Sequence, residues 1–321
     1  MKLRKISSDF TPLHQGLFFG IDTESDTPSD LVVEIIDVAT DKVLAIQQLR
    51  GVVAAEVNVA PYLTPFTEYV PGSYGVCGFK EAPTRECAIR VGDEMSDTLL
   101  ISTNKSLHPT HTMVTAMPEL RSISRGEIDE LLFLGEREEN FFARMKTDTG
   151  DYIDLDYTST TGATVLTISP DDFNRDVRSI EVEVSQNGFP LASLRYTLHT
   201  GHKGSCRLAW ISEEGSIERY TFPVVTKRVC KADKLHIGVG ENRRVVRSST
   251  EEEISLVSQY EPSATIESLA RIISATKVWI EHPLGNREVA VKSSVVDSNL
   301  FGEPVCIELI ISEYCREEAI L

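Results

Sequence analysis

Apolar and polar residues alternate along many short segments of this chain. Between residues 30 and 60 apolar residues recur at every second position, as at Leu31, Val33 and Ile35, and turn residues separate three such runs. A period of two is the pattern of a strand with one buried face, because successive side chains point to opposite sides of a sheet. Many short strands with closely spaced turns predict an antiparallel sandwich or barrel.

The same alternation continues through the middle of the chain. It predicts strands at 153–157, 163–169 and 180–184, and Asn187-Gly188 between two such runs predicts a tight hairpin turn. The segment 195–222 has the pattern of three further strands. We expect these three strands to close the central unit.

The last third of the chain contains a helix pattern. Ser263 is a favourable N-cap, and Ile266, Leu269, Ile272 and Ile273 form a narrow apolar stripe. A strand pattern precedes this segment and three strand patterns follow it. We expect this one helix to cover one sheet.

These elements predict a mainly β protein with tandem antiparallel β-sandwich domains and a C-terminal α+β unit, in which one helix packs on a sheet. A chain of 321 residues is too long for one ordinary domain. We predict an N-terminal sandwich at 1–112, a central β domain at 113–225 and the α+β domain at 226–321. The first boundary rests on Pro109 and Pro118, which bracket a segment of little periodicity.

The chain is strongly acidic. Its formal net charge is −17 and its sequence pI is about 4.9. An acidic surface repels both nucleic-acid phosphates and anionic lipids, so we expect neither nucleic acid nor membrane as a partner. The first 20 residues have no apolar stretch of signal-peptide length, and no run of about 18 apolar residues occurs. We expect a soluble chain made in a cytoplasm.

Candidate chemistry is sparse. His199, His202 and Cys206 form the best metal-ligand spacing, but a strand would point the two histidines to opposite faces. Asp154 and Asp156 fit the solvated face of a strand better than a calcium loop. The six cysteines include no CxxC pair and are expected to be free thiols. Hydrolase and nucleotide-binding motifs are absent, so we expect no catalytic residue, metal or cofactor.

Two segments are candidate contact surfaces. Residues 65–79 are rich in Pro, Gly and aromatic residues and predict an exposed contact loop, with Tyr69, Tyr74 and Phe79 as possible buried anchors. Residues 226–250 carry seven basic and two acidic residues, a local charge of +5. The basic residues proposed for contact are Lys227, Arg228, Arg243, Arg244 and Arg247.

The basic segment has three interpretations. It is a solvated connector, or it docks against an acidic face of a neighbouring subunit, or it contacts nucleic acid. The third is the weakest, because the whole chain is acidic. Docking between unlike surfaces of two copies would be the head-to-tail contact from which rings are built.

Several short strings resemble a known group of proteins. They are Trp210 and Gly215 before Tyr220-Thr221-Phe222, then Leu269 and Val278-Trp279, and the strand end at 57–66. In these strings the chain resembles uncharacterised structural proteins encoded by phages and prophages of Bacteroides-like bacteria. At 57–66 it departs from their pattern, with Asn58 and Ala60 where Asp and Ser would stand. The resemblance implies a virion part of the tail or tail tip, with a tail-protein-like C-terminal unit.

We therefore expect a non-enzymatic structural virion protein, a tail or tail-tip/baseplate component that assembles into a ring or complex. Its partners would be further copies, as a trimer or hexamer, and other virion proteins. The alternative is a carbohydrate-binding or adhesin-type β-sandwich, in which Trp210, Trp279 or the loop tyrosines stack on sugar rings. Both tryptophans lie in apolar strands, which favours core packing instead.

Overall fold

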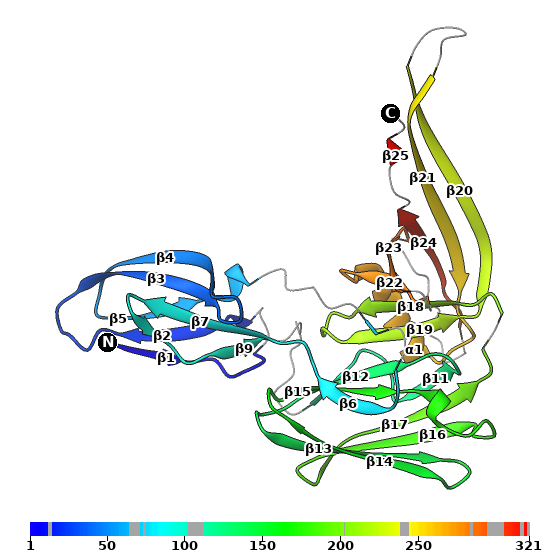
Figure 1. The fold of residues 1–321 in the computed structure, drawn as a ribbon, viewed down its shortest axis with the longest axis horizontal. Helices are drawn as coiled ribbons and strands as arrows, with labels where there is room; N and C mark the ends of the chain where they lie inside the picture. The colour runs from blue at the N-terminus through cyan, green and yellow to red at the C-terminus, as the bar shows by residue number, and fades with distance from the viewer. Residues whose placement is uncertain are drawn as a thin grey trace.

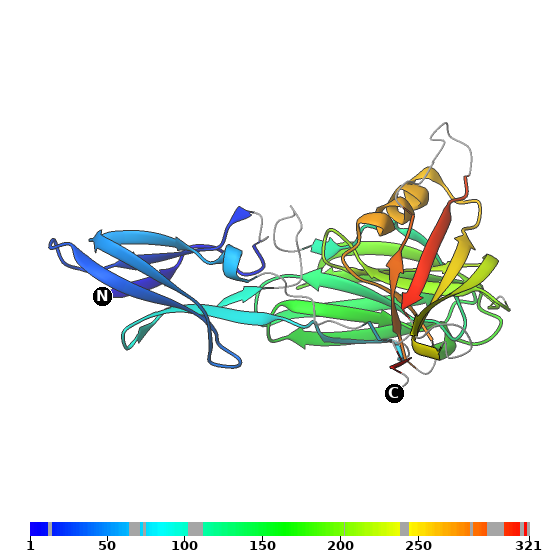
Figure 2. The same cartoon turned by 90° about the horizontal axis from the view of Figure 1, so that it is seen from above.

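The protein is mainly β, with several sheets and an α-helix near the C-terminus. An N-terminal lobe extends to one side of a larger body (Figures 1 and 2), and a long two-stranded hairpin projects from that body (Figure 1). The computed structural model describes residues 1–11, 15–63, 71–72, 75–101, 112–201, 203–237, 244–282, 285–293, 305–314 and 318–319.

The N-terminal lobe is a sandwich of two sheets. One sheet has the order β1-β2-β5, and the other has β4-β3-β7-β8 with β9 paired to β7. Their strands are β1 (Lys2–Lys5), β2 (Phe18–Asp22), β3 (Ser29–Asp37), β4 (Lys42–Val52), β5 (Ala54–Asn58), β7 (Arg85–Val91), β8 (Glu94–Met95) and β9 (Leu99–Ile101), and a 3₁₀ turn spans Ala60–Tyr62. The alternating residues Val33 and Ile35 are buried between the sheets, as the sequence pattern predicts.

The central part is a second sandwich. One sheet has the order β10-β12-β15-β6 and the other β11-β17-β16-β13-β14, in which β11 and β17 run parallel. The strands are β6 (Gly78–Glu81), β10 (Thr112–Val114), β11 (Leu120–Ser124), β12 (Asp129–Leu134), β13 (Glu139–Thr147), β14 (Tyr152–Ser159), β15 (Ala163–Ile168), β16 (Ser179–Gln186) and β17 (Phe189–His199), with a 3₁₀ turn at Pro170–Asp172. Asn187 and Gly188 both have positive φ, which confirms the predicted hairpin turn.

The C-terminal part is one large sheet with the order β19-β18-β22-β23-β24-β21-β20, and β25 pairs with β21. Its strands are β18 (Cys206–Ile211), β19 (Ile217–Phe222), β20 (Val224–Ile237), β21 (Arg244–Val257), β22 (Val278–Ile280), β23 (Arg287–Val291), β24 (Glu308–Tyr314) and β25 (Glu318–Ala319). The predicted strand before the helix and the three strands after it are found as β21, β22, β23 and β24, and the short β25 follows them.

The structure corrects one expectation about chain organisation and shows one strand pairing that the sequence did not predict. Strands β18 and β19 do not close the central unit, because β18 pairs with β22 in the C-terminal sheet. Strand β6, from the N-terminal third, pairs with β15 of the central sandwich. The sheet that each of these strands joins is decided by pairing between segments far apart in the sequence. Local alternation does not encode such pairing. The division into three domains stays a prediction.

The helix α1 (Ser263–Ala270) continues into a 3₁₀ turn at Arg271–Ser274. Pro262 is its N-cap and Ser263 is its first helical residue, so the predicted N-cap is shifted by one position. Leu269 and Ile272 are fully buried, whereas Ile273 is 38% exposed. The tighter 3₁₀ turn explains this difference, because three residues per turn keep positions three apart on one face.

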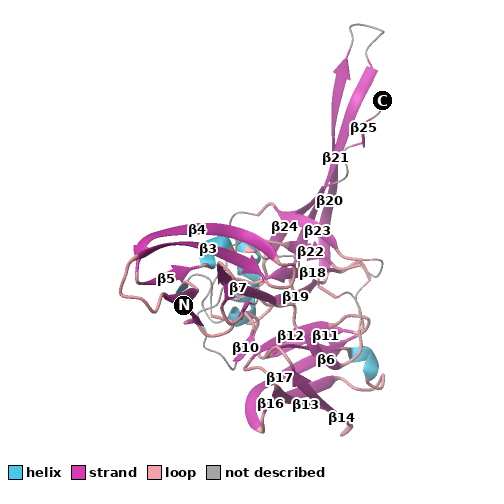
Figure 3. Cartoon of the chain, turned by 60° about the vertical axis from the view of Figure 1, so that its left-hand side comes forward, coloured by secondary structure: helices cyan, strands magenta, loops and turns pink. Residues whose placement is uncertain are grey.

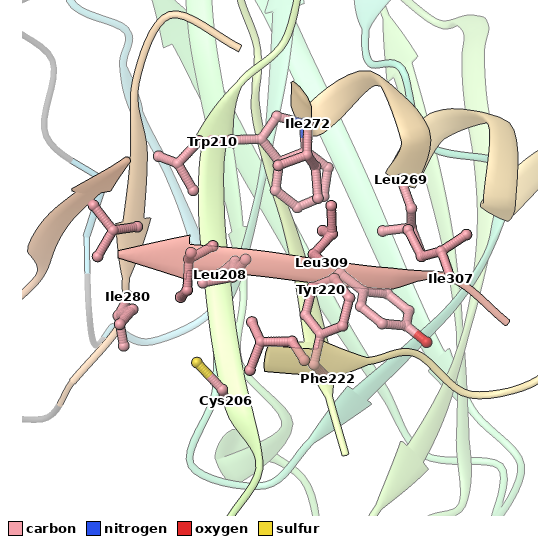
Figure 4. Close-up of a cluster of buried hydrophobic side chains, with 14 of the residues drawn as sticks. Cys206, Leu208, Trp210, Tyr220, Phe222, Leu269, Ile272, Ile280, Ile307 and Leu309 are labelled. Atoms are coloured by element: carbon pink, nitrogen blue, oxygen red, sulfur yellow. The ribbon is translucent and has the colours of Figure 1, made fainter. Parts of the chain in front are cut away.

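The helix packs into the curved C-terminal sheet. In Figure 4, Leu208 and Trp210 come from one strand, Leu309 comes from a strand that crosses it, and Leu269 and Ile272 approach from the helix side. Trp210 is 1% exposed, which confirms that it is a core residue. This core holds the base of the projecting hairpin.

Candidate functional site

The hairpin formed by β20 and β21 is the most distinctive surface feature, and we call these two strands the arm. Each strand has 14 residues, and the two are paired from Val224↔Val257 to Ile237↔Arg244. Among the described residues, β24 pairs with β21 from Glu251 to Val257. The outer half of the arm is therefore a two-stranded ribbon that touches the short β25 and stands clear of the body (Figures 1 and 3).

This geometry corrects the interpretation of 226–250 as a connector. Most of the segment lies in β20 and β21 rather than in a loop. At the base, Ile254 and Leu256 are buried in the C-terminal core, which fixes the direction of the arm. An isolated two-stranded hairpin is at best marginally stable in water. The outer half thus depends on its rigid base or on a partner for its order.

Charge is distributed unevenly along the arm. Near the base, Arg228 Nη1 lies 3.4 Å from Glu252 Oε1, and Lys231 contacts Glu253. These acidic residues offset the basic residues of β20 in this half. Lys227 is exposed and pairs in register with the neutral Ser255.

Further from the base the positive charge is less balanced. The β20–β21 ladder places Lys234, Arg244 and Arg247 opposite residues that have no acidic side chain. The acidic residues in the paired part of this half are Asp233 and, on β25, Glu318, the register partner of Ser248. The arm therefore carries excess positive charge toward its outer end, on a chain whose net charge is −17.

A buried group of charged residues joins the C-terminal sheet to the central sandwich, and we call it the charged junction. Glu281 accepts a 2.8 Å bond from Arg207 Nε and a 2.7 Å bond from Arg219 Nε. Arg219 Nη2 then donates to Glu130 Oε2 at 2.6 Å, and Arg207 Nη1 donates to Glu127 Oε2 at 3.0 Å. Two arginines of β18 and β19 thus hold carboxylates on or beside β12, so the central sandwich and the sheet behind the arm are tied together.

The charged junction shifts the pKa of its members. Burial acts to raise the pKa of Glu130, but the positive charges of Arg219 and Lys80 outweigh it and hold that pKa below its usual range. Burial acts to lower the pKa of Arg219, but Glu130 and Glu281 outweigh it and raise that pKa. The pair therefore stays ionised, and its rupture would leave a buried charge without compensation.

A second buried group lies next to the charged junction. Arg121 Nη1 donates to Asp129 Oδ2 at 3.0 Å, and Tyr196 Oη donates to the same oxygen at 2.7 Å. Glu218 of β19 accepts a 2.8 Å bond from the Thr115 hydroxyl. Burial, with the charge of Asp129, raises the pKa of Tyr196 well above its usual value. Both groups use polar side chains to fix one relative position of the two sheets.

A cleft of about 630 Å³ lies between β11 and the start of α1. Arg195, Tyr220 and Glu261 are among the residues that line it. Tyr220 Oη donates to Glu261 Oε1 at 2.9 Å, and burial raises the pKa of Glu261 despite that bond. The buried arginines on its walls, Arg121, Arg207 and Arg219, are each paired with a carboxylate.

The predicted contact residues fall in different places. Tyr69, Tyr74 and Arg243 lie outside the described residues. Phe79 lies on β6, and its ring stacks on Tyr157 at a centroid distance of 5.8 Å. This half-buried ring packs against the central core, so the structure does not present Phe79 as a free anchor.

The basic contact residues that the structure describes gather on the arm. Lys227 and Arg228 are on β20, and Arg244 and Arg247 are on β21. The sequence predicts a cluster of positive charge in this segment, but it does not predict the projecting hairpin that carries the charge.

The residues with metal-ligand spacing, which the sequence favours as ordinary strand and turn residues, lie in different parts of the fold where the structure describes them. Cys206 is buried in the C-terminal core, where burial raises its pKa to about 11, and His199 ends strand β17 of the central sandwich. His202 lies outside the described residues. Within the described ranges no group of three or more His, Cys, Asp or Glu side chains is arranged to hold a metal ion.

Free thiols are confirmed for the described cysteines, which are Cys77, Cys87, Cys206, Cys230 and Cys306. The described part of the chain also contains no helix that is long and apolar enough to cross a membrane.

The charged junction was not predicted from the sequence. Arg207 is the one charged residue of the apolar strand CRLAWI, and Arg219 follows Glu218 in the strand IERYTF. A charged residue inside an apolar strand is itself a signal, because such a residue is rarely buried without a partner. That signal points to buried pairing, although it does not name Glu130 or Glu281.

Comparisons with known proteins give no family. No protein-family model matches the chain, and no curated protein matches it. One solved structure with a detectable likeness is the tetra-tandem repeat in the extending region of a large adhesion protein. It has 12% sequence identity and a TM-score of 0.22, over 79% of this chain and 69% of that one. A superposition at this level supports no assignment of function.

Proposed function

We propose that this protein is a non-enzymatic structural component that assembles by docking its arm on a neighbouring subunit. The observation that supports this proposal is the two-stranded ribbon that extends beyond its supporting sheet. Such a ribbon gains little from its own chain and exposes a strand edge to other chains. Docking on a partner would satisfy the backbone groups of that edge.

The base of the arm suits this role. Ile254 and Leu256 anchor β21 in the core, and the charged junction ties the same sheet to the central sandwich. Because the base of the arm is already held in place, association loses less conformational entropy than it would if the base had to become ordered. The positive outer half would find acidic surface on other copies, since the chain has a net charge of −17.

The proposed location is a virion, in the tail or tail tip. The short strings around Trp210 and Val278-Trp279 support this location, because they resemble structural proteins of phages and prophages. A ring of three or six copies together with other virion proteins is the form we propose. Neither nucleic acid nor membrane is a proposed partner.

The alternative, a carbohydrate-binding module, has less support. Trp210 and Trp279 are 1% and 4% exposed, so neither ring is free to stack on a sugar. The loop residues Tyr69 and Tyr74 lie outside the described residues. We therefore keep assembly as the main proposal.

A shortened arm tests the proposal. Replacing residues 232–250 with Asn-Gly joins Lys231 to Glu251, which are cross-strand partners, through a two-residue hairpin turn. Light scattering after size exclusion, at low and moderate salt, would measure the mass of both proteins. We expect oligomers of the intact chain that salt weakens, and a lower mass for the folded shortened chain, whose β20 ends at Lys231. Equal masses of the two proteins would contradict the proposal.

A further inference from the structure

Two long strand edges lie at opposite ends of the molecule. Strand β20 is the last strand of the C-terminal sheet, and β14 is the last strand of one central sheet. Among the described residues β20 pairs only with β21, and β14 pairs only with β13. Figures 1 and 3 both show the arm at one end of the body and β14 at the other.

The β14 edge is acidic. Residues 147–159 include four aspartates and no basic residue. Asp154 and Asp156 are exposed, as is Tyr152 at 64%. Arg144 of β13 holds Asp154 with two bonds of 2.7 Å, whereas the register partner of Asp156 is the apolar Phe142. Asp156 thus keeps a carboxylate on the solvent face that no cross-strand cation offsets.

The backbone of β14 is oriented for pairing. The Thr147 N–H donates to the Asp151 carbonyl at 2.8 Å at the start of the β13–β14 hairpin. In an antiparallel ladder the residues that exchange bonds with the partner strand alternate with residues whose backbone groups face the other way. Counting from Asp151, the residues facing the free edge are Tyr152, Asp154, Asp156 and Thr158. The exposed side chains and the outward backbone groups therefore belong to the same residues.

The β20 edge is basic over a similar length. Residues 227–234 carry Lys227, Arg228, Lys231 and Lys234 against Asp233. Arg228 and Lys231 reach glutamates of β21, but Lys227 and Lys234 lie opposite Ser255 and Ser248. This stretch has eight residues, and β14 also has eight.

We propose that the β20 edge of one copy adds to the β14 edge of a second copy, so that a sheet continues from one subunit into the next. This inference rests on the proposed assembly role and names its partner as a second copy of this chain. The contact joins two different surfaces, so it repeats from copy to copy and forms a closed ring or an open filament. Opposite ends of the molecule supply the two edges, which leaves each copy able to make both contacts.

Charge favours this unlike pairing over the two symmetric ones. Pairing β20 with β20 would bring Lys227 and Lys234 against cations of the partner, and pairing β14 with β14 would bring aspartates together. Like charges placed opposite each other across strands are destabilising. Backbone bonds along the shared edge would supply affinity, and side-chain charge would select the partner edge.

A native cysteine makes the contact testable. Cys230 is exposed in the middle of β20. The variants Asp154→Cys and Asp156→Cys would each place a thiol on the β14 edge. After mild oxidation of the purified full chain, we expect disulfide-linked copies whose peptide map joins Cys230 to the new thiol, since paired strands bring Cβ atoms within disulfide reach.

Two controls belong to this experiment. The variant Gln48→Cys puts an equally exposed thiol on β4, the edge of an N-terminal sheet, and should cross-link at background level. Adding Cys230→Ser to either β14 variant should abolish the specific product. Equal yields from β4 and β14 would overturn the inference.

Charge reversal gives a second, independent readout. We expect Lys234→Glu and Asp156→Lys each to weaken association about three- to tenfold at low salt, and the double variant to recover most of the loss. Lys203→Glu, which reverses another exposed cation, should change little. Failure of the double variant to recover would count against direct β20–β14 pairing.

The cross-linking and light-scattering results distinguish self-assembly from the specific contact between β20 and β14. Salt-sensitive oligomers without β20–β14 cross-links would leave assembly standing and would reject this pair of edges. A monomer in light scattering at all concentrations, with no cross-link, would reject both the contact and self-assembly.

Discussion

Arg219 Nη2 lies 2.6 Å from Glu130 Oε2, and the two side chains are 0% and 3% exposed. Arg219 belongs to the C-terminal sheet and Glu130 to the central sandwich, so this ion pair spans the boundary between the two. Burial removes the water that would otherwise stabilise each charge. The C-terminal sheet bears the arm. Its orientation therefore depends on this ion pair with the central sandwich.

Removing one partner of this pair should be costly. We expect Arg219→Met to lower the free energy of unfolding by about 3–5 kcal/mol, because Glu130 and Glu281 would keep buried charge without it. Urea unfolding followed by circular dichroism would measure this loss. The control is Arg144→Met, which breaks the exposed pair with Asp154 and should cost far less, because water already solvates both charges. Similar losses in the two variants would contradict the structural role of the charged junction.

Glu130 and Glu261 should make the stability of the fold depend on pH in opposite directions. Their ordinary pKa is 4.5; it is lowered in folded Glu130 and raised in folded Glu261. The stability from Glu130 is therefore present above about pH 4.5 and is lost as pH falls through its folded pKa. The stability from Glu261 is present below pH 4.5 and is lost as pH rises through its folded pKa.

Unfolding of Glu130→Gln and Glu261→Gln between pH 3 and 7 would test these signs. Relative to the unmodified protein, Glu261→Gln should become more stable as pH rises, and Glu130→Gln should become less stable. Parallel pH profiles for all three proteins would show that neither carboxylate titrates as described.

The helix offers a matched pair of core variants. Leu269 is fully buried and Ile273 is 38% exposed. We expect Leu269→Ala to cost about 2–5 kcal/mol, through lost apolar burial and a cavity. Ile273→Ala should cost about 1 kcal/mol or less, because the side chain already contacts water. Equal costs, measured by denaturant unfolding, would place the helix in a different rotation on the sheet.

Two glycines with similar backbone angles should respond differently to substitution. Gly188 has φ +81° and open space where a Cβ atom would stand, whereas Gly162 has φ +83° and the Glu136 carbonyl oxygen 2.5 Å from the place of its Cβ. Gly188→Ala should cost about 1–2 kcal/mol from backbone strain alone. Gly162→Ala adds a clash with main chain and should cost about 3 kcal/mol or more. Thermal unfolding of both variants would show whether this order holds.

Local pattern was sufficient for much of the fold. Alternation at Val33 and Ile35 predicts β3, the Asn187-Gly188 turn is found, and Leu269 and Ile272 face the core as the helical stripe predicts. Each of these depends on residues that are close together in the chain. Periodicity encodes such features directly.

Features that depend on distant pairing could not be predicted in this way. Alternation does not state that β18 pairs with β22, nor that Arg219 meets Glu130 across 89 residues. The arm was missed for a related reason. Residues 244–250, RVVRSST, have no regular alternation of apolar and polar positions, so this part of β21 lacks the pattern that marks an ordinary strand.

Hydrogen exchange along β20 tests the central claim most directly. Backbone amides of residues 227–237 would be followed by mass spectrometry in the intact chain across a range of protein concentrations. Docking of the arm predicts fast exchange in dilute protein and clear protection as oligomers form, while the buried strand β18 stays protected throughout. Exchange along β20 that is independent of concentration, in a sample that light scattering shows to be oligomeric, would contradict an assembly role for the arm.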